Sequence, residues 1–129
     1  MNENALIYEY SVVRYVPHVE REEFINVGLL MMCKRRRWLR CGISLDGRRI
    51  MSFDREADIE SLRRQLGMFD PASSVLADCT AEERFRWMSA VKSSVIQTSR
   101  PHPGLIECNS DPVEALEATF ERLMRELVL

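Results

Sequence analysis

The chain has 129 residues, of which 46% are hydrophobic and 29% charged, and this length and composition are typical of one folded domain. Its formal net charge of −2 excludes a general electrostatic attraction to nucleic acid. No apolar run approaches the roughly 20 residues that cross a bilayer, and the opening residues show no secretory signal, so we expect a cytoplasmic protein without a membrane anchor.

The first predicted element is a β-strand over residues 6–16. Glu9 and Ser11 alternate with apolar residues, and a period of two is typical of a strand with an apolar face. Pro17 ends the pattern, because proline cannot continue a strand ladder. The apolar positions are Leu6, Tyr8, Tyr10, Val12 and Val16.

A β-hairpin is predicted next, with strands over residues 24–33 and 38–45 and a basic turn between them. A turn that closes symmetrically places Met32 opposite Leu39, so that the two side chains share one face of the sheet. The following residues, 46–53, predict a turn and a short fourth strand.

The second half of the chain predicts three helices. The first begins at Asp54 or Asp58, since aspartate caps helix N-termini. Thr80 and Glu83 form a capping box at the start of the second helix, and Asp111 caps the third. The second helix is expected to carry on one face Phe85, Met88 and Val91. The third has an apolar stripe formed by Leu116, Phe120, Leu123 and Leu127.

The elements together predict an α+β fold. Residues 95–110 contain prolines and a glycine, which exclude a helix and predict a surface loop, with or without a short strand. We expect an antiparallel sheet of three to four strands from a strand-rich half, residues 5–53, packed by about three helices from a helix-rich half, residues 54–129. Both halves are expected to form a single domain over residues 1–129.

Polar residues gather where the first predicted strand ends. Arg14 lies on its otherwise apolar face and needs an anionic partner or access to water. Glu20 and Glu23 follow within nine residues and are available for a corner pairing with Arg14. Asn26 and Gly28 are expected on the inner face of the second strand. The corner is either an anion- or substrate-binding site with a glutamate as general base, or a structural ion-paired corner.

The basic turn is a second candidate site. Its four cations could contact phosphates while Trp38 stacks on a base, which is one mode of nucleic-acid binding. Alternatively, the charge protects the neighbouring strand from edge-to-edge pairing. The four cations are Lys34, Arg35, Arg36 and Arg37.

A third candidate is the loop 98–104, in which hydroxyl groups, an arginine and a histidine lie between prolines. No third group that would orient a serine–histidine pair can be assigned, so anion binding is favoured over catalysis there. The sequence contains no glycine-rich phosphate loop, no GxSxG and no HExxH. Its four cysteines form no CxxC pair, so neither a metal nor a cofactor is expected.

Several segments resemble a bacterial family known as domain-of-unknown-function family 3037. "YEYSVVRYVP" followed by "EREEFINVGLLMMC" is similar to the family's opening, and "VIQTSRPHPG" and "DPVEALEATFERLM" are similar to its closing pattern. The matching residues are Tyr8, Arg14, Pro17, Glu20, Glu23, Phe24, Asn26, Gly28, Trp87, Thr98, Ser99 and Pro101.

The resemblance implies a bacterial, cytoplasmic, stand-alone domain and supplies no catalytic residues. It also implies that the gene for this protein lies beside a gene that encodes a HipA-like kinase. A kinase of this type is therefore an expected partner. If the last loop folds back against the first hairpin, the matching polar residues form one patch. The patch consists of Arg14, Glu20, Glu23, Asn26, Thr98 and Ser99.

We therefore expect a non-catalytic accessory domain that binds a partner protein through this patch or through an exposed sheet edge. The first alternative is a small enzyme or ligand-binding module that uses Arg14, Glu20 and Glu23 on an anionic substrate. The second alternative is nucleic-acid binding through the basic hairpin, residues 34–49, which the net charge makes less favourable. A homo-oligomer is compatible with all three.

Overall fold

The protein is described by a computed structural model that covers residues 5–70, 76–90 and 93–129. Within these residues the chain forms a five-stranded antiparallel sheet in the order β3-β2-β1-β4, with β5 also paired to β1. The strands are β1 (Ala5–Tyr15), β2 (Ile25–Cys33), β3 (Trp38–Ile43), β4 (Ile96–Thr98) and β5 (His102–Glu107).

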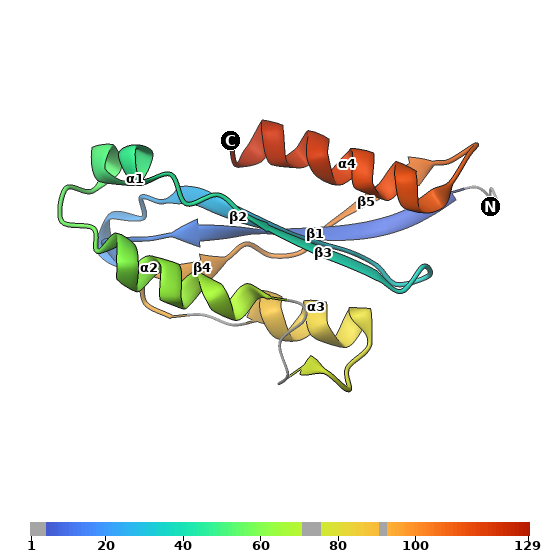
Figure 1. The fold of residues 1–129 in the computed structure, drawn as a ribbon, viewed down its shortest axis with the longest axis horizontal. Helices are drawn as coiled ribbons and strands as arrows, with labels where there is room; N and C mark the ends of the chain where they lie inside the picture. The colour runs from blue at the N-terminus through green and yellow to red at the C-terminus, as the bar shows by residue number, and fades with distance from the viewer. Residues whose placement is uncertain (1–4, 71–75, 91–92) are drawn as a thin grey trace.

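Helices lie on both faces of this sheet, so the fold is α+β (Figure 1). The long C-terminal helix covers one face, and shorter helices cover the opposite face. The α-helices are α1 (Gly47–Phe53), α2 (Ile59–Leu66), α3 (Ala81–Ala90) and α4 (Pro112–Leu127). Two short 3-10 turns are η1 (Val19–Arg21) and η2 (Gly67–Phe69).

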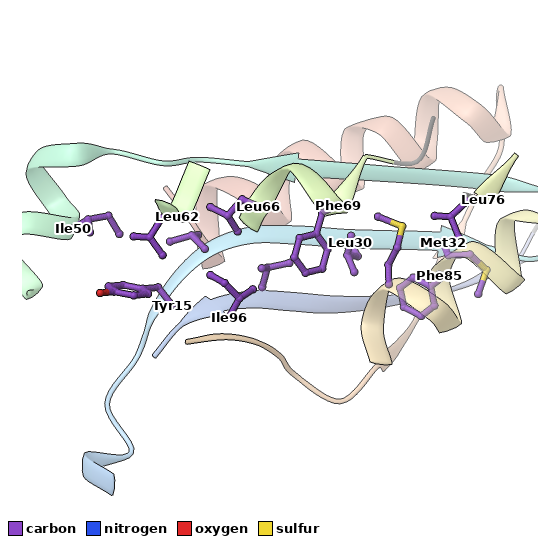
Figure 2. Close-up of a cluster of buried hydrophobic side chains, with 13 residues drawn as sticks. Tyr15, Leu30, Met32, Ile50, Leu62, Leu66, Phe69, Leu76, Phe85 and Ile96 are labelled. Atoms are coloured by element: carbon purple, nitrogen blue, oxygen red, sulfur yellow. The ribbon is translucent and has the colours of Figure 1, made fainter. Parts of the chain in front are cut away.

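Each face of the sheet carries its own buried cluster. Figure 2 shows the cluster on the side of α2 and α3, where Leu30 and Met32 of β2 contribute together with Phe85 of α3. On the other face, Leu29 and Met31 of β2 pack in a cluster with Phe120 of α4. Because both faces are covered, β2 is apolar at consecutive positions instead of alternating.

The predicted hairpin register is confirmed, since Met32 pairs with Leu39 and Leu30 pairs with Cys41. Gly28 pairs with Ile43 in the same ladder, and a Cβ on Gly28 would lie only 2.6 Å from Ile43 Cδ1. This close approach explains the glycine inside an otherwise apolar strand.

The predicted fourth strand over residues 46–53 is wrong, because this segment forms helix α1. Asp46 caps it, and its side chain accepts a hydrogen bond of 3.0 Å from the backbone N–H of Arg48. Ile50 is its buried residue, and the partly buried Phe53 also packs against the core. The Asp-Gly pair indicates a turn equally well, and this local ambiguity led to the wrong assignment.

The segment after α3 contains more regular structure than the sequence predicts. Within residues 95–110, β4 and β5 both pair with β1, although the segment contains prolines. Pro103 is tolerated because β5 pairs with β1 alone, at the edge of the sheet. The strand-rich and helix-rich halves are therefore interleaved, since two strands come from the second half of the chain.

The predicted helix starts are confirmed. Asp58 caps α2 and accepts a hydrogen bond of 3.1 Å from Ser61 N. The capping box of α3 has both its bonds, from Glu83 N to Thr80 Oγ1 at 3.1 Å and from Thr80 N to a Glu83 carboxylate oxygen at 3.2 Å. Asp111 caps α4 by accepting from the N–H of Val113. Of the predicted apolar face of α3, Phe85 and Met88 are buried, and Val91 lies outside the described residues.

Candidate functional site

Three polar side chains form a row across the sheet near the C-terminal end of β1. Arg14 pairs with Asn26 of β2 on one side and with Gln97 of β4 on the other. Residues that pair directly across an antiparallel ladder point to the same face. We call these three residues the polar row; it lies on the face that α4 covers, because Asn26 reaches the last turn of that helix.

A β-bulge creates this row. The register shifts so that Val13 pairs with Gly28 while Arg14 pairs with Asn26, which leaves Val27 as an extra residue in β2. Gly28 and Asn26 consequently face opposite sides of the sheet. The prediction that they share one inner face is wrong, because a bulge breaks the period of two.

Arg14 is the charged member of the row and lacks an anionic partner. Its guanidinium carbon lies 4.2 Å from the centre of the Phe24 ring, within the range of a cation–π contact. Within residues 5–70, 76–90 and 93–129, no carboxylate lies within ion-pair distance of Arg14. Its Nε is buried without a hydrogen-bond partner. The half-buried side chain thus packs on Phe24 and has no ion-pair partner among the described residues.

Asn26 anchors the other end of the row to α4. Its Nδ2 donates a hydrogen bond of 2.9 Å to the carbonyl oxygen of Leu127, while its Oδ1 is buried and without a partner. Arg49 adds a second link, since its Nη1 donates to the carbonyl oxygens of Asn26 at 3.1 Å and Val128 at 2.6 Å. These bonds hold the C-terminal end of α4 against the bulge.

The two glutamates of the predicted patch lie away from Arg14, and the corner pairing does not form. Glu20 is exposed, with its Oε1 3.8 Å from His18 Nδ1. Glu23 lines a separate hollow together with His18 and Asp54. The chain leaves β1 at Pro17 and turns through η1, which directs the glutamates outward.

Thr98 and Ser99 are buried and serve the fold. Thr98 Oγ1 donates to the carbonyl oxygen of Ser89 in α3. Ser99 Oγ accepts a hydrogen bond of 2.9 Å from Val12 N, and Ser11 Oγ donates to the Ser99 carbonyl at 2.7 Å. The last loop therefore does fold back against β1, but its hydroxyl groups are used in holding it there. The structure brings together only Arg14 and Asn26 among Arg14, Glu20, Glu23, Asn26, Thr98 and Ser99.

A hydrogen-bonded pair at the same end of β1, on the opposite face of the sheet from the polar row, was not predicted. Tyr15 donates a hydrogen bond of 2.6 Å to Asp54 Oδ2 and so links β1 to the segment between α1 and α2. This bond is the main cause that lowers the pKa of Asp54 below its ordinary value. Burial, followed by the hydrogen bond to Asp54 and its negative charge, raises the pKa of Tyr15. Both groups keep the charge states that favour the bond at neutral pH.

A groove of about 600 Å³ lies at the opposite, N-terminal end of β1. Ile7 projects there and is 59% exposed, and its cross-strand partner Leu105 is 62% exposed. The sequence signal was the apolar Ile7 at a position where the alternation predicts a polar residue. The groove is lined by Ala5, Ile7, Tyr8, Glu9, Met32, Lys34, Arg35, Arg37 and Glu82.

The rim of the groove is rich in charge. Arg86 of α3 donates to both carboxylate oxygens of Glu9, with one bond of 2.8 Å, which raises the pKa of Arg86 further. Lys34 lies 3.5 Å from Glu82. Arg35 and Arg37 have no ion pair within the described part of the chain. Arg37 adopts a left-handed backbone conformation with φ of 51°, which is unfavourable for a residue other than glycine.

Two residues of the basic hairpin contact α4. Trp38 Nε1 donates a hydrogen bond of 3.1 Å to Glu117. Arg40 forms ion pairs with Glu117 and, at 2.7 Å, with Glu121, and its guanidinium lies over Phe120. The indole N–H and this arginine therefore link β3 to α4.

The thiol of Cys41 is a poor candidate nucleophile. Burial, with a smaller contribution from the charge of Asp70, raises the pKa of Cys41 to about 12, so it is a protonated, weak nucleophile at neutral pH. No group of three or more histidine, cysteine or acidic residues in the described ranges is placed to hold a metal ion. Among the helices in those ranges, none has the length and apolar character needed to cross a bilayer.

These features define an α+β protein with a five-stranded antiparallel sheet between two helical layers, a polar row at one end of β1 and an apolar groove at the other. The chain belongs to the family described as "Protein of unknown function (DUF3037)", whose model matches residues 10–128. No curated protein and no solved structure shows significant similarity to it.

Proposed function

We propose that this protein is a non-catalytic interaction domain that binds a partner protein at the N-terminal end of β1. The observation that carries the proposal is the exposed apolar pair of Ile7 and Leu105 beside the groove. Contiguous apolar surface that faces water is unfavourable, and such patches are a feature of protein contact surfaces. We call Ile7, Leu105 and the groove the docking surface.

The neighbouring strand edge supports the same proposal. β5 pairs with β1 on one side, and no other strand of the described chain pairs with its second side. An open edge offers unpaired backbone groups to an extended segment of a partner. The docking surface therefore combines apolar contacts with a potential row of main-chain hydrogen bonds.

The candidate nucleophiles favour binding over catalysis. The hydroxyl groups of Thr98 and Ser99 are tied to backbone groups, and the thiol of Cys41 is held protonated. A bacterial, cytoplasmic accessory domain agrees with these features. A HipA-like kinase encoded nearby is the first partner to test, because the family resemblance of the sequence implies it.

Affinity purification of the tagged protein from its native host, with bound proteins identified by mass spectrometry, tests the proposal. We expect a stoichiometric partner that is lost when Leu105 is changed to glutamate. Met51→Glu is the matched control, since Met51 is also an exposed apolar residue but belongs to α1 at the other end of the molecule. Circular dichroism should show both variants folded.

Three outcomes contradict the proposal. One is the absence of any stoichiometric partner. Another is a partner that still binds both the Leu105→Glu variant and the double variant that combines Leu105→Glu with Ile7→Glu. The third is equal loss of the partner in the Met51→Glu control. A partner that does bind can then be mixed with the purified domain to measure affinity directly, with the kinase as the first candidate.

A further inference from the structure

We propose that the hollow beside Arg14 and Gln97, two members of the polar row, is a binding site for a small carboxylate that carries an apolar group. Arg14 supplies the charge and Gln97 a side-chain amide, and these two residues pair directly across the β1–β4 ladder. The site lies at the end of β1 opposite to the docking surface. It is therefore independent of the proposed partner interaction.

The first argument is the uncompensated charge. A cation that is partly withdrawn from water is unfavourable unless an anion or hydrogen-bond acceptors replace its hydration. Arg40 and Arg86 each face a carboxylate, and Arg49 donates to two carbonyl oxygens. Arg14 has neither kind of partner among the described residues, although its Nε is buried. A bound anion would supply the acceptor for the Arg14 guanidinium that no described residue provides.

The second argument is the geometry of the surrounding hollow, which measures about 310 Å³. Phe24 packs against the guanidinium, with 4.2 Å between the guanidinium carbon and the ring centre, and so restricts its orientation. A guanidinium held in place can donate two parallel hydrogen bonds to the two oxygens of a carboxylate. The Gln97 amide also lines the hollow and forms no hydrogen bond with another described residue, so it is available as an additional donor.

The walls determine the class of ligand. Val16, Val19 and Phe24 contribute apolar surface beside the charged group, and Phe24 is itself 45% exposed. An aromatic or branched aliphatic body on the ligand would cover this surface. Glu22 lines the same hollow and repels a second negative charge. The site is therefore expected to prefer monocarboxylates to phosphate or dicarboxylates.

An NMR titration of the full ¹⁵N-labelled chain with sodium benzoate tests the site. We expect saturable shifts of the Arg14 Nε–H signal and of the Phe24 and Gln97 backbone amides. Sodium acetate, which lacks the apolar body, should bind more weakly, and sodium phosphate at equal ionic strength should give no saturable shift. Benzylammonium chloride has the same ring with a positive charge and should not bind.

Variants distinguish a specific binding site from general ion binding. Arg14→Lys keeps the charge but loses the planar fork, and we expect benzoate binding to weaken by about tenfold or more. Arg125→Gln is the matched control, because Arg125 is exposed on α4 and away from the hollow, and it should bind as the unchanged protein does. Backbone amide spectra establish that each variant is folded.

The proposal is overturned if benzoate produces no saturable shift, if Arg14→Lys binds as well as the original chain, or if benzylammonium shifts the same signals. A test of Leu105→Glu keeps the two proposals apart, since this variant should bind benzoate normally even though its partner binding is lost. Failure at the polar row leaves the docking surface unaffected, and failure at the docking surface leaves the row unaffected.

Discussion

The two ends of β1 differ in the kind of side chain that lacks a favourable partner. At the N-terminal end Ile7 and Leu105 expose apolar surface to water, and at the C-terminal end Arg14 holds a charge without a described anion. Each arrangement is unfavourable for an isolated chain, but for opposite reasons. The difference indicates that the N-terminal end suits a large apolar partner and the C-terminal end a small anion.

The largest expected effect concerns the packing beneath the N-terminal end. A Cβ on Gly104 would lie 2.1 Å from Cζ of the buried Tyr8, so Gly104→Ala must displace that ring. We expect a loss of about 2–3 kcal/mol in the free energy of unfolding, measured by urea denaturation. The matched control is Gly67→Ala, because a Cβ on Gly67 has no neighbour within 4 Å.

A double variant sharpens this first prediction. Tyr8→Leu removes the ring, so adding Gly104→Ala in that background should lose less than about 1 kcal/mol. A loss below about 0.5 kcal/mol for Gly104→Ala alone would show that the N-terminal end is loosely packed on both faces. The contrast between a tightly packed face around Tyr8 and an exposed face around Ile7 would then be wrong.

The next effect belongs to the C-terminal end. Tyr15→Phe removes the hydrogen bond to the half-buried Asp54 and should lower the free energy of unfolding by about 1 kcal/mol at neutral pH. Because this bond lowers the folded-state pKa of Asp54, its contribution is present above the ordinary aspartate pKa of about 3.9. The contribution is lost as the pH falls through the lower pKa of the folded state.

Urea titrations of both proteins between neutral and acidic pH measure this dependence. The stability difference between Tyr15→Phe and the original chain should shrink in acid. At alkaline pH the original chain should lose stability above the ordinary tyrosine pKa of about 10, since burial beside Asp54 raises the pKa of Tyr15. A difference that stays constant with pH would contradict the role of the Asp54 charge.

A smaller effect of opposite sign is expected at the hairpin next to the docking surface. Arg37 has a φ of 51°, so Arg37→Gly should raise the free energy of unfolding by about 0.5–1 kcal/mol. Arg37→Ala removes the same charge and retains the strain, so it should give no such gain. If Arg37 contributes to docking, both variants bind the partner more weakly, as titration calorimetry would show.

The smallest effect is expected at the polar row. Arg14→Met keeps the aliphatic stem and removes a charge that has no anionic partner among the described residues, so stability should change by less than about 0.5 kcal/mol. Arg40→Met is the comparison, since Arg40 has two carboxylate partners and should lose more. A loss above about 2 kcal/mol for Arg14→Met would mean that Arg14 serves the fold rather than a ligand.

The elements that could be predicted from the sequence depend on neighbouring residues. The helix caps at Asp58, Thr80 and Asp111 involve residues within three positions, and the hairpin register follows from a short turn. The segment 46–53 shows the limit of this local reasoning, because an aspartate followed by glycine begins a helix as readily as a turn.

The candidate site was predicted in part. Arg14 and Asn26 were identified as functional candidates, and the structure pairs them. Gln97 and Phe24 completed the arrangement without having been predicted as site residues, because Gln97 reaches the row only through the pairing of β4 with β1. Ile7 and Leu105 were likewise brought together by strands distant in sequence.

The class of fold, the capped helices and the hairpin follow from local sequence patterns, because hydrophobic periodicity and capping act over a few residues. The grouping of residues into a site depends instead on long-range contacts. The pairing of β4 and β5 with β1 joins segments more than 80 positions apart, as the bond between Ser11 and Ser99 shows. The bulge at Val27 then reversed the faces of Ile25 and Asn26, the β2 residues before it. Such choices depend on contacts distant along the chain, which periodicity does not encode.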